Sequence, residues 1–281
     1  RDRSVSRGLG DVYKRQVQHN MASANTNRQL GLTNTNLSKS TEKLSSGYRI
    51  NRAGDDAAGL SISEKMRSQV RGLNRASDNS QDGISLIQTA EGAMNEQHAV
   101  LQRARELAVQ AANDTNVTAD RDAIKEELTA LKKEFDRIKD ETEFNTMKLL
   151  NGTFTSKMLQ VGANTNQSIS ITISTTTMTD ISSQVATHAN ATAAISSIDA
   201  NITALSTQRS KLGALQNRLE YSIRNADNTA ENLQAAESRI RDVDMAEEMT
   251  RYSKDSILQQ AAQSMLAQAN QATRGVLSLL Q

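Results

Sequence analysis

The chain of 281 residues contains no cysteine, no proline and no tryptophan, and its aromatic residues are limited to four Tyr and three Phe. Without cysteine the chain has no disulfide framework, thiol nucleophile or Cys-ligated metal site. Its three histidines are too scattered in sequence to suggest a metal site in their place. A globular enzyme normally builds its core and pockets partly from aromatic side chains. The composition therefore favours an extended architecture in which long helices contact each other through Ala, Leu, Ile and Val.

Charge and hydropathy exclude two further classes of protein. The chain has 33 basic and 32 acidic residues, a formal net charge of +1, so it lacks the positive field of a nucleic-acid-binding protein. No stretch approaches the roughly 20 apolar residues that cross a bilayer, so we expect no membrane insertion. No apolar segment near the N-terminus resembles a cleavable signal peptide. Residues 1–16 show no helical period and resemble translated cloning sequence, with a genuine basic tail as the alternative.

Apolar residues at heptad spacing predict a helix near each end of the chain. In the first helix, Leu30, Leu37 and Leu44 share one face, and the turn-prone residues before Gly47 are expected to end it. The last helix is too rich in Gln for lipid and too poor in charge for an ordinary solvated helix. We expect the last helix to pair with the first and to need further copies of the chain to cover it. Its apolar stripe consists of Leu258, Ala262, Met265, Ala269, Ala272, Val276 and Leu279.

Between the ends, two longer apolar seams predict a pair of long helices. The first seam comprises Ile87, Ala90, Met94, Gln97, Leu101, Ala104, Ala108 and Ala111, and its single Gln would help to fix the register. The second comprises Leu212, Leu215, Leu219, Ser222, Ala226, Thr229, Leu233, Ala236, Ile240 and Val243. A third helix is expected to begin after an N-cap at Thr118 and to carry apolar residues from Ile124 to Ile138. We expect it to fold back against the helix that carries the first seam.

The remaining segments predict a little β-structure and a surface loop. Residues 153–161 and 168–174 alternate polar and apolar residues on either side of a turn, which predicts one β-hairpin. Between Lys157 and Arg209 the only charged residues are two Asp, a composition typical of a surface segment rather than a core element. The expected fold is mainly α: long antiparallel helices forming a rod with one small β-hairpin, and terminal helices that pair.

Seven strings along the chain resemble bacterial flagellin. They occur in the family's order: LSSGYRIN from residue 44, DDAAGL from 55, LQRARELAV from 101, FNTMKLL from 144, LQVGAN from 159, LGALQNRLE from 212, and ILQQ to LAQANQ from 257. Chance agreement over seven separate strings is negligible. The resemblance implies a structural subunit, without enzymatic activity or cofactor, that self-assembles into the bacterial flagellar filament for motility. It also implies that the terminal helices pair as a coiled coil in that filament.

The resemblance divides the chain into segments with separate roles. We expect a non-native segment at 1–16, an N-terminal filament-core helix and connector at 17–52, the N-terminal part of the rod domain with the β-hairpin at 53–174, a reduced variable outer segment at 175–202, the C-terminal rod helix at 203–243, and the C-terminal filament-core helix at 244–281. The filament-core residues are Leu30, Leu37, Leu44, Leu258, Met265, Val276 and Leu279. The rod seam residues are Ile87, Met94, Leu101, Leu212, Leu215, Leu219, Leu233 and Ile240.

The resemblance also implies partners. These are further copies of the chain in a helical homopolymer, an export chaperone, the filament cap and the hook-filament junction proteins. Type III export without a cleavable signal peptide would deliver the chain to the extracellular flagellum. Arg103, Leu107 and Glu127 match positions at which similar flagellins bind the vertebrate Toll-like receptor for flagellin, and at which they contact neighbouring subunits.

The residues themselves leave alternatives open. Arg103 and Leu107 form an i,i+4 pair of the kind found in binding hot spots, but the solvated face of a helix has the same composition. A hook-filament junction protein would resemble flagellin at its termini, and long filaments seen by electron microscopy would distinguish the two. A hydrolase using Asp55, Asp56 or His98 is the alternative from another class. Adjacent Asp side chains point to different sides, however, and the flanking Ala and Gly favour a tight packing role for Asp55 and Asp56.

Overall fold

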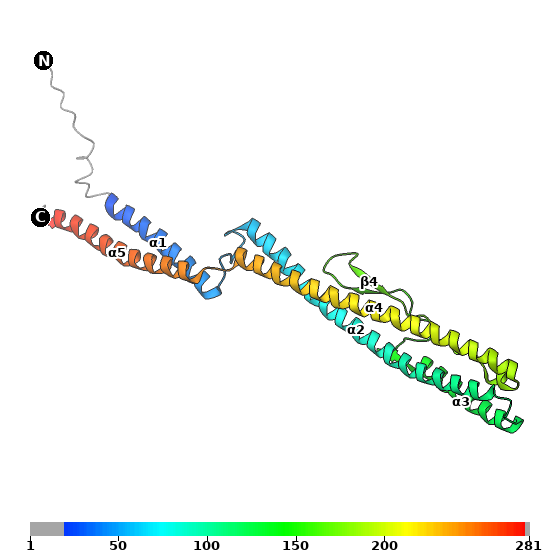
Figure 1. The fold of residues 1–281 in the computed structure, drawn as a ribbon. Helices are drawn as coiled ribbons and strands as arrows, with labels where there is room; N and C mark the ends of the chain where they lie inside the picture. Colours follow the sequence, from blue (N-terminus) through cyan, green and yellow to red (C-terminus); the bar gives the residue numbers. More distant parts are fainter. Residues whose placement is uncertain (1–19, 279–281) are drawn as a thin grey trace, which may run out of the picture. The chain divides into compact units, whose positions relative to one another are not determined.

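The computed structural model describes residues 20–278, without the side chains of residues 183 and 272–278. Residues 1–16, predicted to be non-native, and Leu279 lie outside the described residues. The described chain is mainly helical, which confirms the predicted class (Figure 1). Its helices are α1 (Met21–Ser46), α2 (Ala57–Ala111), α3 (Thr118–Glu141), the 3-10 turn η2 (Ser182–Val185), α4 (His188–Arg241) and α5 (Met245–Ser278). The chain forms two compact units: a terminal unit, up to Lys65 and from Ala236 onward, and a bundle unit, Met66–Ala235.

The terminal unit is built on an antiparallel pair of helices, α1 and α5 (Figure 1). Near the start of α1, the Ser23 hydroxyl donates to Asn270 Oδ1 at 2.9 Å, and further along the Gln259 side-chain amide donates to Asn34 Oδ1 at 2.8 Å. The helix α1 ends where Gly47 adopts a left-handed conformation with a φ of 75°, and its N–H donates to the Lys43 carbonyl. Glycine suits this position because it has no Cβ to strain.

The connectors of the terminal unit cap the end of α4. The Arg49 guanidinium donates through Nε (3.1 Å) and Nη2 (2.5 Å) to the Ile240 carbonyl, and the Arg241 guanidinium lies over the Tyr48 ring. A helix C-terminus leaves carbonyls without intrahelical partners, so the Arg49 hydrogen bonds satisfy an acceptor that would otherwise need water. The helix ends at Arg241, and Val243, predicted as the last seam residue, lies beyond it.

In the bundle unit, α2 and α4 run antiparallel and α3 folds back beside α2 (Figure 1). Two ion pairs tie α2 to α4, Arg105 to Asp199 at 2.7 Å and Arg209 to Glu91 at 3.6 Å. All eight positions of the predicted first seam are 0% exposed: Ile87, Ala90, Met94, Gln97, Leu101, Ala104, Ala108 and Ala111. Four of these are alanines, which allow neighbouring elements to approach α2 closely.

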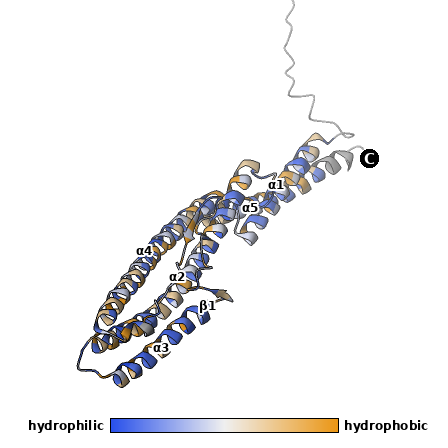
Figure 2. Ribbon diagram, turned by 90° about the vertical axis from the view of Figure 1, so that its right-hand side faces the viewer, coloured by the Kyte–Doolittle hydropathy of each residue, from blue (hydrophilic) through white to orange (hydrophobic). Residues whose placement is uncertain are grey.

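The helix α3 is hydrophilic along most of its length (Figure 2). It buries an apolar stripe that includes Ile124, Leu128 and Phe135. Its N-cap is Val117 rather than the predicted Thr118, which is the first helical residue. The Asp120 carboxylate accepts the Val117 N–H at 3.2 Å, so an acidic side chain one turn into the helix satisfies the donor at its start.

The structure contains the predicted hairpin and, within the described residues, a second one. Strands β3 (Lys157–Gln160) and β4 (Ser168–Ile171) pair antiparallel, with Lys157 opposite Ile171, and are shorter than the predicted strands. The second hairpin joins β1 (Glu143–Phe144) to β2 (Met147–Lys148). Its turn residues Asn145 and Thr146 have φ values of 47° and 65°, as in the tight turns that match strand twist. Strands of two residues carry no alternation that a sequence pattern could reveal.

Two glycines let the β3–β4 hairpin dock on α2. A Cβ placed on Gly83 would lie 2.5 Å from Leu159 Cδ2, and one on Gly72 would lie 2.8 Å from the Ala163 Cβ. Both distances are too short for real contacts. The absence of a side chain at these two positions therefore allows the hairpin to pack against the helix backbone.

The segment predicted to be a surface loop is partly core. The helix α4 begins at His188 instead of residue 203, and Ala191, Ala194 and Ile198 are buried. Ile181 and Val185, in and beside η2, are buried as well. The low charge and small residues that suggested a loop have another cause, because a helix that packs tightly against its neighbours also needs small uncharged side chains.

Candidate assembly and binding surfaces

The inner face of α1 carries the three leucines predicted from the heptad pattern. Leu30, Leu37 and Leu44 are half-buried, and between them Thr33 and Ser40 are buried. These five positions follow one another at spacings of three and four, so they form one stripe along the helix. The stripe covers one side of α1 and leaves the rest of its circumference exposed.

The predicted stripe of α5 is corrected at two positions. The half-buried face of α5 carries Gln259, Ala262, Leu266 and Ala269, while Leu258 and Met265 are exposed. Two apolar rows run side by side along this helix and share its alanines, so spacing alone does not tell which row faces α1. The cross-helix hydrogen bond of Gln259 belongs to the inner row. Leu279 lies outside the described residues, as does the side chain of Val276.

The α1–α5 pair exposes a series of large apolar side chains, which we call the outer residues. On α5 they recur at helical spacing: Met249 follows Met245 by one turn, and Met265 follows Leu258 by two turns. Exposed apolar groups on this scale typically mark an interaction surface rather than a solvated one. The outer residues are Met21, Leu32, Met245, Met249, Ile257, Leu258 and Met265.

The seam along α2 and α4 contains the other predicted core residues. Ile87, Met94, Leu101, Leu212 and Leu219 are fully buried. Leu215, Leu233 and Ile240 are half-buried, and the last two lie near the C-terminal end of α4. The seam is therefore closed along its middle and more open toward that end of the helix.

Gln97 is the polar member of this seam. Its side-chain amide nitrogen lies 3.5 Å from the Phe135 carbonyl, and its Oε1 is buried with no hydrogen-bond partner. A buried acceptor without a partner costs free energy because it has lost its hydrogen bond to water. Gln97 therefore links α2 to α3 through one hydrogen bond, and its unpartnered oxygen lowers the free energy of unfolding.

The predicted receptor-contact residues separate into a surface pair and a core residue. Arg103 Nη2 and Nε lie 2.8 and 3.0 Å from Glu127 Oε1, which joins α2 to α3, and Nη1 lies 3.1 Å from Glu106 Oε2. The hydrogen bonds that Arg103 donates to Glu127 and Glu106 raise the pKa of its guanidinium, so the side chain stays cationic. Both side chains of the Arg103–Glu127 pair are about half exposed. Leu107 is only 2% exposed, so in the free subunit it supports this surface from below rather than forming part of it.

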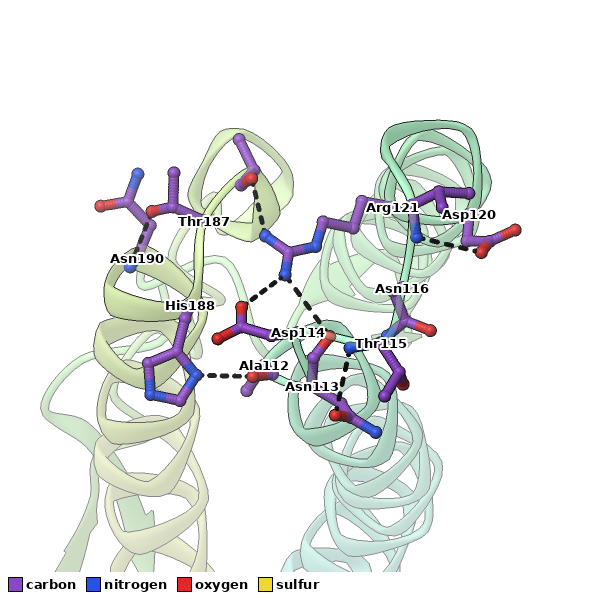
Figure 3. Close-up of polar contacts among 12 residues, drawn as sticks. Ala112, Asn113, Asp114, Thr115, Asn116, Asp120, Arg121, Thr187, His188 and Asn190 are labelled. Atoms are coloured by element: carbon purple, nitrogen blue, oxygen red, sulfur yellow. Dashed lines mark hydrogen bonds and ion pairs between the residues drawn. The ribbon is translucent and has the colours of Figure 1, made fainter.

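A polar cluster that the sequence reasoning missed joins the α2–α3 turn to the segment before α4 (Figure 3). Arg121 donates from Nη1 to the Ala186 carbonyl at 2.9 Å and from Nη2 to Asp114 Oδ1 at 3.1 Å. Close by, His188 Nδ1 lies 2.6 Å from the Ala112 carbonyl. No sequence signal marks Arg121, since a basic residue in the first turn of a helix resembles any solvated side chain. The cluster holds two turns together and offers no reacting group.

The residues proposed for hydrolysis have structural partners. The Asp55 carboxylate accepts the backbone N–H groups of Arg52 (3.0 Å) and Asn51 (3.2 Å), which lower its pKa. Asp56 accepts the N–H of Gly59 in the first turn of α2, and His98 contacts Gln102. Over residues 20–278 the structure contains no group of three potential ligands that could hold a metal ion. Over the same residues it contains no helix apolar and long enough to span a bilayer.

Comparison with known proteins identifies one family at both ends of the chain. Residues 17–155 match the family model of the bacterial flagellin N-terminal helical region, and residues 195–280 match that of the C-terminal helical region. A flagellin of Halalkalibacterium halodurans is 55% identical over 269 residues, which cover 94% of this chain and 99% of that relative. A flagellin of Bacillus subtilis is 49% identical over 301 residues, with coverage of 94% and 99%.

A solved structure supports the architecture. A protein from Vibrio parahaemolyticus, provisionally described as a flagellar hook-associated protein, aligns with a TM-score of 0.59 over 67% of this chain and 100% of its own length. The sequence identity is 10%, so this likeness shows the fold alone.

Proposed function

Since the chain belongs to the bacterial flagellin family, we propose that its α1–α5 pair makes the contacts by which the subunit polymerises. The chain is a structural subunit of the flagellar filament, which lies outside the cell, and it is not an enzyme. Two relatives named flagellin are matched over 99% of their length, which favours a filament subunit over a hook-filament junction protein.

The observation that supports the role of the pair is the position of its apolar surface. The inner faces of α1 and α5 cover each other, while the outer residues, such as Ile257 and Leu258, face solvent. Burying a side chain of this size is worth about 1.5–3 kcal/mol. Several such residues on each subunit supply a driving force that is realised only when neighbouring subunits cover them. The filament-core role of Leu258, Met265, Val276 and Leu279 is part of this proposal.

The experiment changes two of the outer residues and leaves the half-buried faces of α1 and α5 unchanged. We expect the double variant Ile257→Asp/Leu258→Asp to keep the helical content of the monomer and to lose polymerisation, measured by light scattering and electron microscopy. The matched control is Val117→Asp, which places a charge on an exposed apolar residue of the bundle unit. Normal filaments from the double variant, or an equal loss from the control, would show that the pair is not the main contact.

We also propose that Arg103 and Glu127 form part of a contact surface for the innate immune flagellin receptor. Their side chains are half exposed, carry opposite charges and are held in place by each other. Truncating an arginine inside a desolvated contact typically costs more than about 2 kcal/mol, or roughly thirtyfold in affinity. Arg103→Ala should therefore weaken binding of the monomer to the receptor ectodomain by about that factor.

The control for the receptor experiment is Arg137→Ala on α3. Arg137 is equally exposed and forms ion pairs with Glu134 and Glu141 on its own helix. Equal affinity of the parent and Arg103→Ala, at matched fold stability, would assign the segment to solvated helix surface. The export chaperone, cap and junction proteins, and export without a cleavable signal peptide, stay predictions from the family resemblance.

A further inference from the structure

Methionine carries all the side-chain sulfur of this protein, because the chain has nine Met and no Cys. Eight of the nine methionines are either buried or exposed, and the ninth, Met66 on α2, is half-buried. Met94 and Met178 are buried in the bundle unit. Four others are exposed on the α1–α5 pair, and two more are exposed on the hairpins. The four are Met21, Met245, Met249 and Met265, and the two on the hairpins are Met147 and Met158.

We propose that the four methionines of the α1–α5 pair are oxidation sites that prevent an unassembled subunit from joining the filament. The oxidant is hydrogen peroxide. The thioether sulfur attacks one peroxide oxygen, an S–O bond forms as the O–O bond breaks, and the displaced oxygen leaves as water after taking up the proton of the transferred oxygen. Sulfur loses two electrons and the peroxide gains them. The product is a sulfoxide, which methionine sulfoxide reductases can reverse.

The location of these side chains explains why oxidation would act on assembly. A sulfoxide is polar and accepts hydrogen bonds, so burying it against an apolar neighbour costs free energy that the thioether does not cost. The four methionines are among the outer residues, which we propose become covered when neighbouring subunits assemble; the inference rests on that proposed function. The same atoms face water in the free subunit and are therefore open to peroxide only before assembly.

The inner contacts of the subunit should survive the reaction. Met245, Met249 and Met265 lie off the half-buried face of α5, which carries Gln259, Ala262, Leu266 and Ala269, and Met21 on α1 is exposed as well. Met94 is 0% exposed and is protected from solvent by the packed seam. Oxidation should therefore lower the ability to polymerise while leaving the monomer folded, which separates this effect from general oxidative unfolding.

The experiment treats the full chain with hydrogen peroxide as monomer and as preassembled filament. Peptide mass spectrometry then gives the sulfoxide fraction at each methionine. In the monomer, we expect the four sites and the hairpin sites Met147 and Met158 to react first, and Met94 and Met178 last. In the filament, the four sites should become resistant, while preassembled filaments stay intact.

The consequence for assembly is measured as the critical concentration for polymerisation. We expect the oxidised monomer to show a rise of about tenfold or more, since converting one buried apolar contact into a polar one changes association by that order. Replacing all four methionines by Leu keeps their volume and apolar character and should abolish the sensitivity. The matched control, Met147→Leu/Met158→Leu, removes two exposed methionines of the hairpins and should stay as sensitive as the parent.

A competition within one sample needs no variant. After partial oxidation and polymerisation, the subunits recovered in filaments should be depleted of sulfoxide at the four sites relative to those left in solution. Equal sulfoxide in both fractions, or unchanged sensitivity in the Leu variant, overturns the inference. Failure of the proposed function looks different: the variant Ile257→Asp/Leu258→Asp would then polymerise normally, whatever the oxidation state of the methionines.

Discussion

The two units of this protein use apolar residues in different ways. The bundle unit closes its seam within the subunit, so that Leu101, Leu212 and Leu219 are fully buried. The terminal unit pairs two helices and leaves Ile257 and Met265 exposed. Two helices can cover only one stripe of each other, whereas α2 is covered by α3, α4 and a hairpin. The bundle unit therefore covers its apolar seam within a single chain, and we propose that the terminal unit needs neighbouring subunits to cover its outer residues.

The largest expected effect comes from a charge placed in the closed seam. Leu219→Asp should destabilise the bundle unit by at least about 4 kcal/mol, because the change leaves a cavity and buries an unpaired carboxylate. Denaturant unfolding followed by circular dichroism measures this loss. The control is Leu258→Asp on the exposed row of α5, which should leave the unfolding midpoint nearly unchanged and affect only polymerisation. Equal stability of the two variants would remove the distinction between the units.

Hydrogen exchange sharpens the same comparison along the backbone. Amides in a closed core exchange through global unfolding, whereas those of a lone helix pair exchange through local opening. We expect residues 256–271 of α5 to exchange at least about a hundredfold faster in the monomer than residues 87–108 of α2. In the filament the α5 segment should become protected. Protection of α5 in both states would contradict the view that assembly completes this unit.

Gln97 provides a test of how completely the seam is packed. Gln97→Leu removes a buried acceptor that has no partner and fills the site with apolar atoms, so we expect a gain of about 1–2 kcal/mol in unfolding free energy. The exposed residue Gln110 on the same helix gives the control, and Gln110→Leu should change stability by less than about 0.5 kcal/mol. A loss of stability in Gln97→Leu would mean that its hydrogen bond to the Phe135 carbonyl outweighs the missing partner.

The smallest effect is expected at the surface ion pair between α2 and α3. A double-mutant cycle with Arg103→Ala and Glu127→Ala should give a coupling free energy below about 1 kcal/mol, because both side chains are half exposed. The coupling should fall as salt is added. A coupling of several kcal/mol would make this pair a structural element of the bundle and weaken its assignment to a receptor contact.

Spacing predicted the first long seam in full because a closed helix interface imposes a strict period, whereas in the second seam Thr229 is exposed and Val243 lies beyond the end of α4. The eight residues from Ile87 to Ala111 were all identified by their alternation of three and four, and all are buried. The same method placed Leu258 and Met265 on the wrong side of α5, because two apolar rows share Ala262 and Ala269 and only the partner helix selects one. Composition placed residues 188–202 in the predicted surface segment 175–202, since a tightly packed helix and a loop are both rich in small uncharged residues.

The candidate sites show the same limit. The family motif identified Arg103, Leu107 and Glu127 together, but burial separates Leu107 from the other two. The cluster around Arg121 could not be predicted, because its acceptors include backbone carbonyls at Asn113 and Ala186 that no residue type reveals.

The sequence by itself determined the helical class, the periods of the seams and the family, because these depend on residue types at regular intervals and on strings that chance does not produce. Only the tertiary structure decided which of two apolar rows on α5 faces inward, where α4 begins and which predicted contact residues reach solvent. Those features depend on which element packs against a helix face, and the residues of that face do not by themselves specify their packing partner.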